Sequence, residues 1–154
     1  IFFPTLRPKD EGEKKELKIA VAVVNSGAKL KGWEEMNTIA HLNAAFGARM
    51  GRELLFQDQI MTKDDQEIHL NIQHAIMIKT IDSNKGILKL IDEAKAEGLS
   101  ISEFTQEMIE TTDDRKVIQA TKAKDRKDVA YLGVLVFGKK SQVEHLTKDL
   151  KLFS

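Results

Sequence analysis

Cysteine is absent from this chain of 154 residues, which excludes disulfides, thiol nucleophiles and cysteine-ligated zinc. Proline is scarce, with 2 residues near the start, and no apolar run approaches the roughly 20 residues that a membrane-spanning helix needs. An excess of charge of either sign is also missing, because 24 basic side chains balance 24 acidic ones. We therefore expect a cytoplasmic protein with no membrane partner.

The neutral balance also disfavours a nucleic-acid partner, because phosphate neutralisation by Lys and Arg dominates that kind of affinity. The 4 histidines show neither H-x-H nor H-E-x-x-H spacing, so we expect no metal site. Phosphate-loop and dinucleotide-binding glycine motifs are missing as well, so we expect no cofactor. A small-molecule ligand remains the candidate partner, and the sequence leaves a homodimer open.

Composition divides the chain into an N-terminal arm, residues 1–16, and a single domain, residues 17–154. The arm holds both prolines and a run of mixed charge, and we interpret it as an extended tail. An alternative, in which Phe2 and Phe3 dock on the domain or on a partner, stays open.

Three apolar runs predict strands that are buried on both faces, because they lack the alternation of a half-exposed strand. They are Leu17–Val24, Ala75–Ile81 and Val129–Phe137. A short strand over 99–104 and a hairpin from 53–61 and 67–70 are also expected. With helices over 33–50, 83–97 and 141–150, the pattern predicts an α/β three-layer sandwich. Its mixed sheet has four to five strands, and helices cover both faces.

Local signals refine these helices. In the first one Met36, Ile39, Ala40 and Phe46 approximate one apolar stripe, which we expect to face the core. The second has Ser83 as a candidate N-cap and Gly98 at its C′ position. The polar stretch 111–128 is expected to be a helix or loop insertion on the surface.

The segment from Asn25 to His41 is the best candidate for a site, because it combines a strand end, a glycine-bearing loop and a helix N-terminus. Lys29 and Lys31 would add positive charge there. Asn37 and His41 lie one turn apart on the same helix face, and histidine suits proton transfer near neutral pH. The alternative is that this Asn/His pair only satisfies nearby backbone groups.

Two stretches at the end of the chain carry a resemblance. Residues 131–138 (YLGVLVFG) and 143–152 (VEHLTKDLKL) resemble the final strand and helix of type II peptidyl-tRNA hydrolases. The patterns Val-Val-Asn, Asn-x-x-Ala-His-Leu and Phe-Thr-x-x-Met more closely resemble an uncharacterised family, domain of unknown function two thousand. That family is considered related to the hydrolases in fold, so the resemblance implies a fold like theirs.

The resemblance also implies site residues. His41 falls on the hydrolases' helical histidine and would act as general base or acid, while Lys29 falls on a loop lysine and would stabilise negative charge. Glu103 and Thr105 fall on an acid and a threonine of the hydrolases and would orient the substrate. Asn25, Asn37 and Lys31 are expected to bind the ligand, and we expect these side chains to share one cleft.

This sequence departs from the hydrolase pattern in two places. Glu34 stands where the hydrolases have a second lysine, and the Ala-Gly-Arg part of their Asp-Ala-Gly-Arg-Thr segment is missing before Thr105. We therefore predict weak or absent peptidyl-tRNA hydrolase activity. Three hypotheses remain: an enzyme, such as an ester hydrolase, with a small anionic-ligand pocket; a non-catalytic binding module; and a protein-interaction domain.

Overall fold

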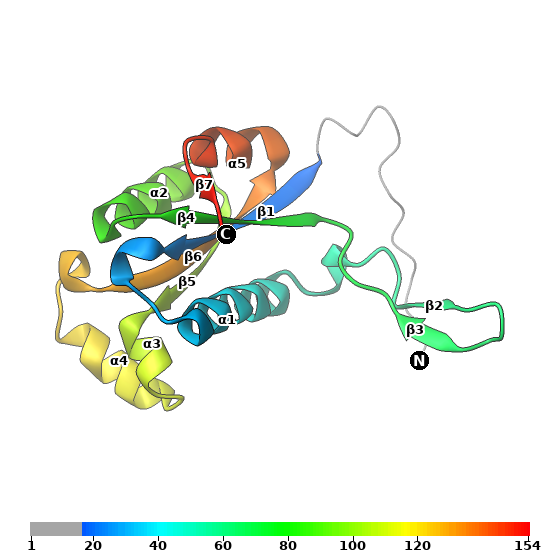
Figure 1. The fold of residues 1–154 in the computed structure, drawn as a ribbon, viewed down its shortest axis with the longest axis horizontal. Helices are drawn as coiled ribbons and strands as arrows, with labels where there is room; N and C mark the ends of the chain where they lie inside the picture. The colour runs from blue at the N-terminus through cyan, green and yellow to red at the C-terminus, as the bar shows by residue number, and fades with distance from the viewer. Residues whose placement is uncertain (1–16) are drawn as a thin grey trace.

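A five-stranded mixed sheet forms the centre of the computed structural model, which describes residues 17–154 (Figure 1). Its strands lie in the order β5-β6-β1-β4-β7. Their bounds are Lys18–Asn25 (β1), Ala75–Ile81 (β4), Ser100–Thr105 (β5), Tyr131–Lys139 (β6) and Lys151–Leu152 (β7). β1 and β4 are parallel, whereas β6 and β7 are antiparallel to their neighbours. The predicted arm, with Phe2 and Phe3, lies outside the described residues.

Helices cover both faces of this sheet (Figure 1). α1 (Gly32–Met50) lies on one face, while α2 (Asn84–Ala96) and α5 (Lys140–Thr147) lie on the other. Side chains of β1 alternate between the two layers: Ala20 and Ala22 belong to the core under α1, and Val21 and Val23 to the core under α2 and α5. The prediction of an α/β fold with a mixed sheet is therefore confirmed.

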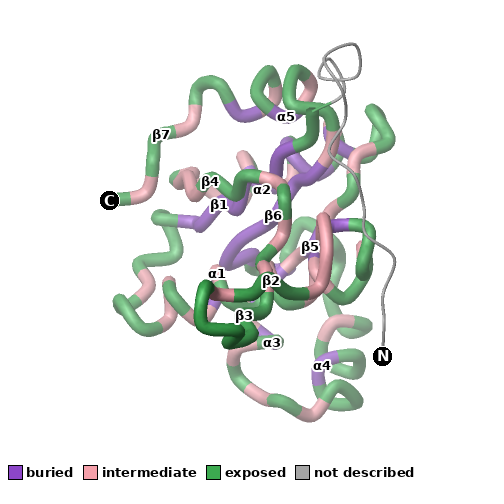
Figure 2. The backbone as a smooth tube through the Cα atoms, turned by 90° about the vertical axis from the view of Figure 1, so that its right-hand side faces the viewer, coloured by how far each residue is buried: buried purple, intermediate pink, exposed green. Residues whose placement is uncertain are grey.

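The two central strands come from distant parts of the chain. β1 pairs with β6 so that Val21 lies opposite Val136 and Val23 opposite Val134, and all four side chains are buried. Their apolar runs lack alternation because a helix layer covers each face. Burying a valine fully is worth about 1.5–3 kcal/mol, so this pair of strands contributes strongly to the core (Figure 2).

The prediction that β4 is a fully buried inner strand is wrong for its first half. On its outer side β4 pairs with β7 only at Lys79 and Thr80, because β7 has just 2 residues. Ala75 is exposed, Ile76 is 39% exposed and Met77 is 38% exposed. The unbroken apolar run therefore predicts the strand correctly, but it does not show that both faces of the strand are buried.

The predicted apolar stripe of α1 is wrong in part: Phe46 is buried as predicted, but Met36 and Ala40 are exposed. Its buried residues are Thr38, Leu42 and Phe46, whereas Met36 is 63% exposed. The reason lies in β6: a Cβ at Gly133 would come within 2.8 Å of the Thr38 methyl. The helix approaches the sheet closely at this point, and the short side chain of threonine suits the contact.

The remaining predicted elements form with small shifts in their bounds. The hairpin is β2 (Gln59–Met61) paired with β3 (Glu67–His69), preceded by the 3-10 turn η3 (Gly51–Leu54) instead of a longer strand. In α2 the Ser83 hydroxyl accepts a hydrogen bond from the Gly86 N–H at 3.0 Å, and Gly98 has φ +72° at the helix end, as predicted.

The polar segment 111–128 contains α4 (Asp114–Lys122) and η4 (Arg126–Asp128). No helix within residues 17–154 is long and apolar enough to cross a membrane.

Candidate functional site

One edge of the sheet collects the ends of three strands. β1, β4 and β5 all finish there, and the antiparallel β6 begins there (left side of Figure 1). They lead into η2 (Ser26–Ala28), α2 and α3 (Gln106–Glu110), while η4 precedes β6. In α/β sheets ligands bind at the carboxyl ends of strands, next to helix N-termini.

A pocket of about 400 Å³ opens at this edge. Its walls come from the loop after β1, the turn between β4 and α2, the start of α3 and the segment that leads into β6. The lining residues are Asn25, Gly27, Ala28, Asp82, Ser83, Asn84, Gln106, Asp128, Val129, Ala130, Tyr131 and Leu132. The volume lies within the range of small-ligand sites.

Two asparagine side chains fix the wall formed by β6. Asn84 accepts from the Tyr131 backbone N–H at 2.7 Å and donates to the Val129 carbonyl at 3.0 Å. Asn25, which is 4% exposed, donates to the Tyr131 carbonyl at 2.9 Å and accepts from the Gly27 N–H at 2.9 Å. Both amides are thus committed to the scaffold, and they make this wall rigid before any ligand arrives.

A glycine allows two other walls to touch. A Cβ at Gly27 would lie 2.2 Å from the backbone oxygen of Asp82, a distance that no side chain tolerates. The backbone of η2 therefore packs directly on the turn between β4 and α2. The Ser26 hydroxyl strengthens this contact by donating to the Ile81 carbonyl at 3.1 Å.

The charge of the pocket lining is negative. Asp82 and Asp128 belong to the lining, both exposed to solvent, whereas no lysine or arginine among residues 17–154 is part of it. Gln106 adds an amide on a third side. This composition differs from the positive charge that Lys29 and Lys31 were expected to supply.

The side chain of Tyr131 takes part in a polar network on the α2 side of the sheet. Its hydroxyl donates to Glu103 at 3.1 Å, and burial, together with the Glu103 charge, raises the pKa of Tyr131 above its ordinary value. Arg126 pairs with Asp92 at 2.8 Å next to this contact. Glu103 therefore supports the start of β6 from behind the pocket.

His41 lies on the opposite side of the sheet. Its ring stacks on Phe104 with centroids 4.8 Å apart, and Nδ1 lies 2.9 Å from the Asn37 carbonyl oxygen. Because a carbonyl can only accept, Nδ1 carries the proton, and Nε2 keeps its lone pair when the ring is neutral. The backbone of Asn37, not its amide, makes this contact.

The structure places two of the predicted site residues, Glu103 and His41, on opposite faces of the sheet. Along β5 the side chains of neighbouring residues point to opposite faces, so Glu103 lies with Tyr131 while Phe104 lies with His41. Thr105 pairs with Tyr131 after a bulge in the ladder and is buried. Their assigned roles remain predictions.

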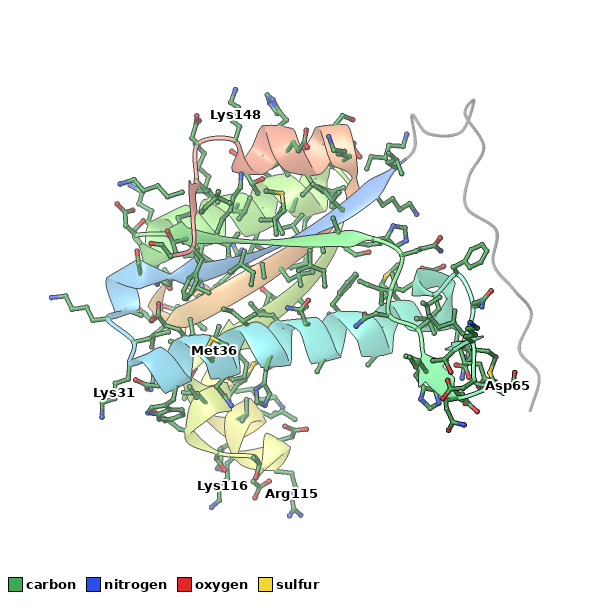
Figure 3. All side chains as sticks on the ribbon, turned by 45° about the vertical axis from the view of Figure 1, so that its right-hand side comes forward. Lys31, Met36, Asp65, Arg115, Lys116 and Lys148 are labelled. Atoms are coloured by element: carbon green, nitrogen blue, oxygen red, sulfur yellow. The ribbon has the colours of Figure 1, made fainter. Side chains whose placement is uncertain are left out.

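The two predicted lysines lie on the surface near the pocket. Lys29 directly follows the lining residue Ala28 and has a left-handed backbone with φ 53°. Lys31 caps α1 with its backbone N–H bonded to Glu34 at 2.9 Å, and its side chain points into solvent (Figure 3). Of the seven predicted residues only Asn25 lines the pocket.

Comparison with known proteins identifies the family. The family model "Protein of unknown function (DUF2000)" matches residues 18–154. The chain belongs to this DUF2000 family. A solved structure of a protein of unknown function from Agrobacterium tumefaciens is similar to it, with a TM-score of 0.75 and 17% sequence identity over 89% of this chain and 98% of that one. At this identity the likeness establishes the fold alone. A search of curated proteins gives no match.

In this DUF2000 chain sequence reasoning missed most of the pocket. Asp82, Ser83 and Asn84 follow a predicted strand and begin a predicted helix, which is the same signal that drew attention to the segment after β1. Applying it to the second strand would have found them. Gln106 also follows a predicted strand, but Asp128 carries no such signal, because tertiary folding alone brings it to this edge. Within residues 17–154, no group of three or more His, Asp or Glu side chains is arranged to hold a metal ion.

Proposed function

We propose that this domain binds a small polar molecule in the pocket at the carboxyl ends of β1 and β4. The observation that carries the proposal is the pocket itself, about 400 Å³ in volume, at the edge where parallel strands lead into helices. Its rear wall is fixed in advance by Asn25 and Asn84. Preorganisation of this kind reduces the entropy cost of binding.

The lining favours a ligand that carries an amine or guanidinium group. Asp82 and Asp128 supply acceptors of negative charge, and no basic side chain among residues 17–154 competes for them within the lining. A cationic group would meet complementary charge, whereas an anion would meet repulsion. The proposed ligand is therefore cationic, in contrast to the anion that the sequence suggested.

Calorimetric titration tests this proposal with matched pairs of small molecules. Putrescine and agmatine are the cationic probes, and glutarate and inorganic phosphate are the anionic ones. We expect binding of at least one cation and none of either anion. The Asp82→Asn and Asp128→Asn variants should each weaken cation binding by roughly tenfold, which corresponds to about 1.4 kcal/mol. Asp149→Asn, an exposed acid beyond α5, is the control and should leave binding unchanged.

Ester hydrolysis is a second candidate, supported by His41 and by the resemblance of the chain's end to type II peptidyl-tRNA hydrolases. The Nδ1 contact with Asn37 leaves Nε2 in the form that a general base requires. Under this candidate Lys29 stabilises the oxyanion, and the fold is of the hydrolase type. The placement of Glu103 on the other face weakens it, so binding without turnover is the preferred function.

A further inference from the structure

The hairpin formed by β2 and β3 stands apart from the rest of the domain. Figure 1 shows it projecting beyond the end of α1, away from the five-stranded sheet. Every residue of its two strands is exposed, and within residues 17–154 no other helix or strand packs extensively on them. A hairpin of two strands is only marginally stable in water without a third strand or a packed face. This hairpin finds neither within the described chain.

Apolar side chains lie on both faces of the hairpin. Ile60 and Ile68 are direct partners across the ladder, so they share one face, and both are exposed. Met61, the next residue along β2, lies on the opposite face and is exposed as well. Among residues 17–154 the outer edge of β2 pairs with no strand. An unpaired edge of this kind is a template for another strand.

The outer edge of β4 offers a vacant position of the same length as β2. β4 pairs along its whole length with β1, but on its outer side β7 and the residue after it bond only to the stretch 78–80. Within the described chain, no strand neighbours the outer edge of Ala75, Ile76 and Met77. This vacant stretch has three residues, as β2 does.

The side chains along the two edges match each other. Ile76 lies opposite Ala20, on the α1 face of the sheet. Met77 lies opposite Val21, on the face of α2 and α5. Both are partly exposed, so this edge, like that of β2, carries one exposed apolar side chain on each face. An added strand covers both of them, whereas a helix docked on one face would cover one.

A second copy of the chain brings the two edges together. In its own chain the hairpin forms a separate sheet and lies away from the outer edge of β4 (Figure 1). Around a two-fold axis the hairpin of each copy meets β4 of the other, so one arrangement fills both vacant edges in both copies. The net charge of the chain is zero, so no overall repulsion opposes the association of two copies.

We propose that two copies of this chain form a dimer in which β2 of each copy pairs with residues 75–77 of the other and extends its sheet. The contact is independent of the ligand pocket, because the pocket lies where β4 ends and this edge lies where β4 begins. The interface is small, so the dimer dissociates on dilution.

Sedimentation velocity of the full chain, from micromolar to millimolar concentration, tests the proposal. We expect the sedimenting mass to rise with concentration from one chain toward two. Ile60→Lys in β2 and Met77→Glu in β4 should each weaken the dimer by roughly tenfold or more, because a charge on an edge opposes strand pairing. Ile118→Glu, at a side chain that is 53% exposed on α4, is the control and should leave dimerisation unchanged.

Circular dichroism of each variant shows whether it is folded. Met77→Gln, a milder change that keeps the length of the side chain, replaces Met77→Glu should that variant fail to fold. It should weaken the dimer in the same direction, because a polar group then lies in the paired region.

Mixing the two weakened variants separates this dimer from other pairings. A dimer of one Ile60→Lys chain and one Met77→Glu chain has one unaltered contact, and the other contact carries opposite charges. We therefore expect the equimolar mixture to dimerise roughly fivefold more tightly than either variant alone. A mixture no stronger than its components would overturn the proposal.

Two other outcomes of the sedimentation experiment would also overturn the proposal. One is a chain that stays monomeric at every concentration. The other is a dimer that the β4 variant leaves intact, because the hairpins would then pair with each other instead of with β4.

Discussion

The side-chain amides of Asn25 and Asn84 bind the backbone of one residue, Tyr131, from two sides. Asn25 ends β1 and Asn84 begins α2, so the bonds join three segments that are distant in the sequence. Tyr131 in turn begins β6, and its hydroxyl is fixed by Glu103. The edge of the sheet that carries the pocket is thus held together by polar contacts, not by apolar packing alone.

Replacing Asn25 by alanine should destabilise the fold. The substitution leaves the Tyr131 carbonyl and the Gly27 N–H without their partner in a buried setting. We expect the free energy of unfolding to fall by about 2 kcal/mol, measured by urea denaturation. Asn71→Ala, at an exposed position, should change it by less than about 0.5 kcal/mol. Equal effects of the two substitutions would show that the amide of Asn25 adds no stability.

Two glycines should respond to alanine in opposite directions. At Gly133 a Cβ would lie 2.8 Å from both the Thr38 methyl and the Val23 carbonyl oxygen, so Gly133→Ala should cost about 1–3 kcal/mol. At Gly47, inside α1, the Cβ would meet nothing within 4 Å, so Gly47→Ala should stabilise by roughly 0.5–1 kcal/mol. Thermal unfolding of both variants checks the pair, and a loss of stability in Gly47→Ala would contradict the description of α1.

Acid should weaken the contact between α3 and the segment after α4. Glu107 is 5% exposed and forms an ion pair with Lys124. Burial by itself raises the pKa of Glu107, but the bond and charge of Lys124, the backbone N–H of Glu107 itself and the Thr105 hydroxyl together outweigh burial, so the pKa lies below the ordinary value. A depressed carboxyl pKa gives stability that is present at neutral pH and is lost as the pH falls through and below the ordinary carboxyl range.

Thermal unfolding across this pH range measures the effect. The melting temperature of the native protein should fall more steeply with acid than that of Glu107→Gln, which lacks the titrating group. Glu97→Gln, at an exposed position, serves as the control and should keep the native slope. If Glu107→Gln also kept it, the ion pair would not contribute to acid sensitivity.

Peptidyl-tRNA hydrolysis should be weak or absent. Asp82 and Asp128 belong to the lining of the pocket, and no lysine or arginine among residues 17–154 does. Binding of tRNA needs positive potential, which this lining does not supply. The measurement is release of peptide from a peptidyl-tRNA by the purified protein beside His41→Ala. Rapid, salt-sensitive turnover that is lost in His41→Ala would refute both this prediction and the preference for binding without catalysis.

The sequence predicted those parts of the fold that depend on local pattern. Uninterrupted apolar runs located β1 and β6, and Ser83 and Gly98 marked the ends of α2, because caps act through neighbouring backbone groups. On the buried face of α1 the sequence predicted Phe46 but missed Thr38, because the contact of Thr38 with Gly133 involves a distant strand. The 2 residues of β7 are too few for any periodicity.

The candidate site was less predictable than the fold. A strand end followed by a helix predicted a site at the edge of the sheet that carries the pocket, and Asn25 lines that pocket. The prediction then followed α1 to His41, which lies on the other side of the sheet beside Phe104. Which face a side chain occupies depends on register, and the bulge before Thr105 leaves no mark in the sequence.

The pairing of β1 with β6 has a consequence for synthesis. Asn25 and the Tyr131 carbonyl that it binds are 106 positions apart, so translation at about 5–20 residues per second leaves β1 without this neighbour for roughly 5–20 s. β4, the other neighbour of β1, is completed only about halfway through that interval, and the valines of β1 face an open side until β6 follows. A nascent chain therefore carries the apolar strand β1 incompletely covered for seconds, and transiently exposed apolar surface of this kind makes incomplete chains prone to aggregate.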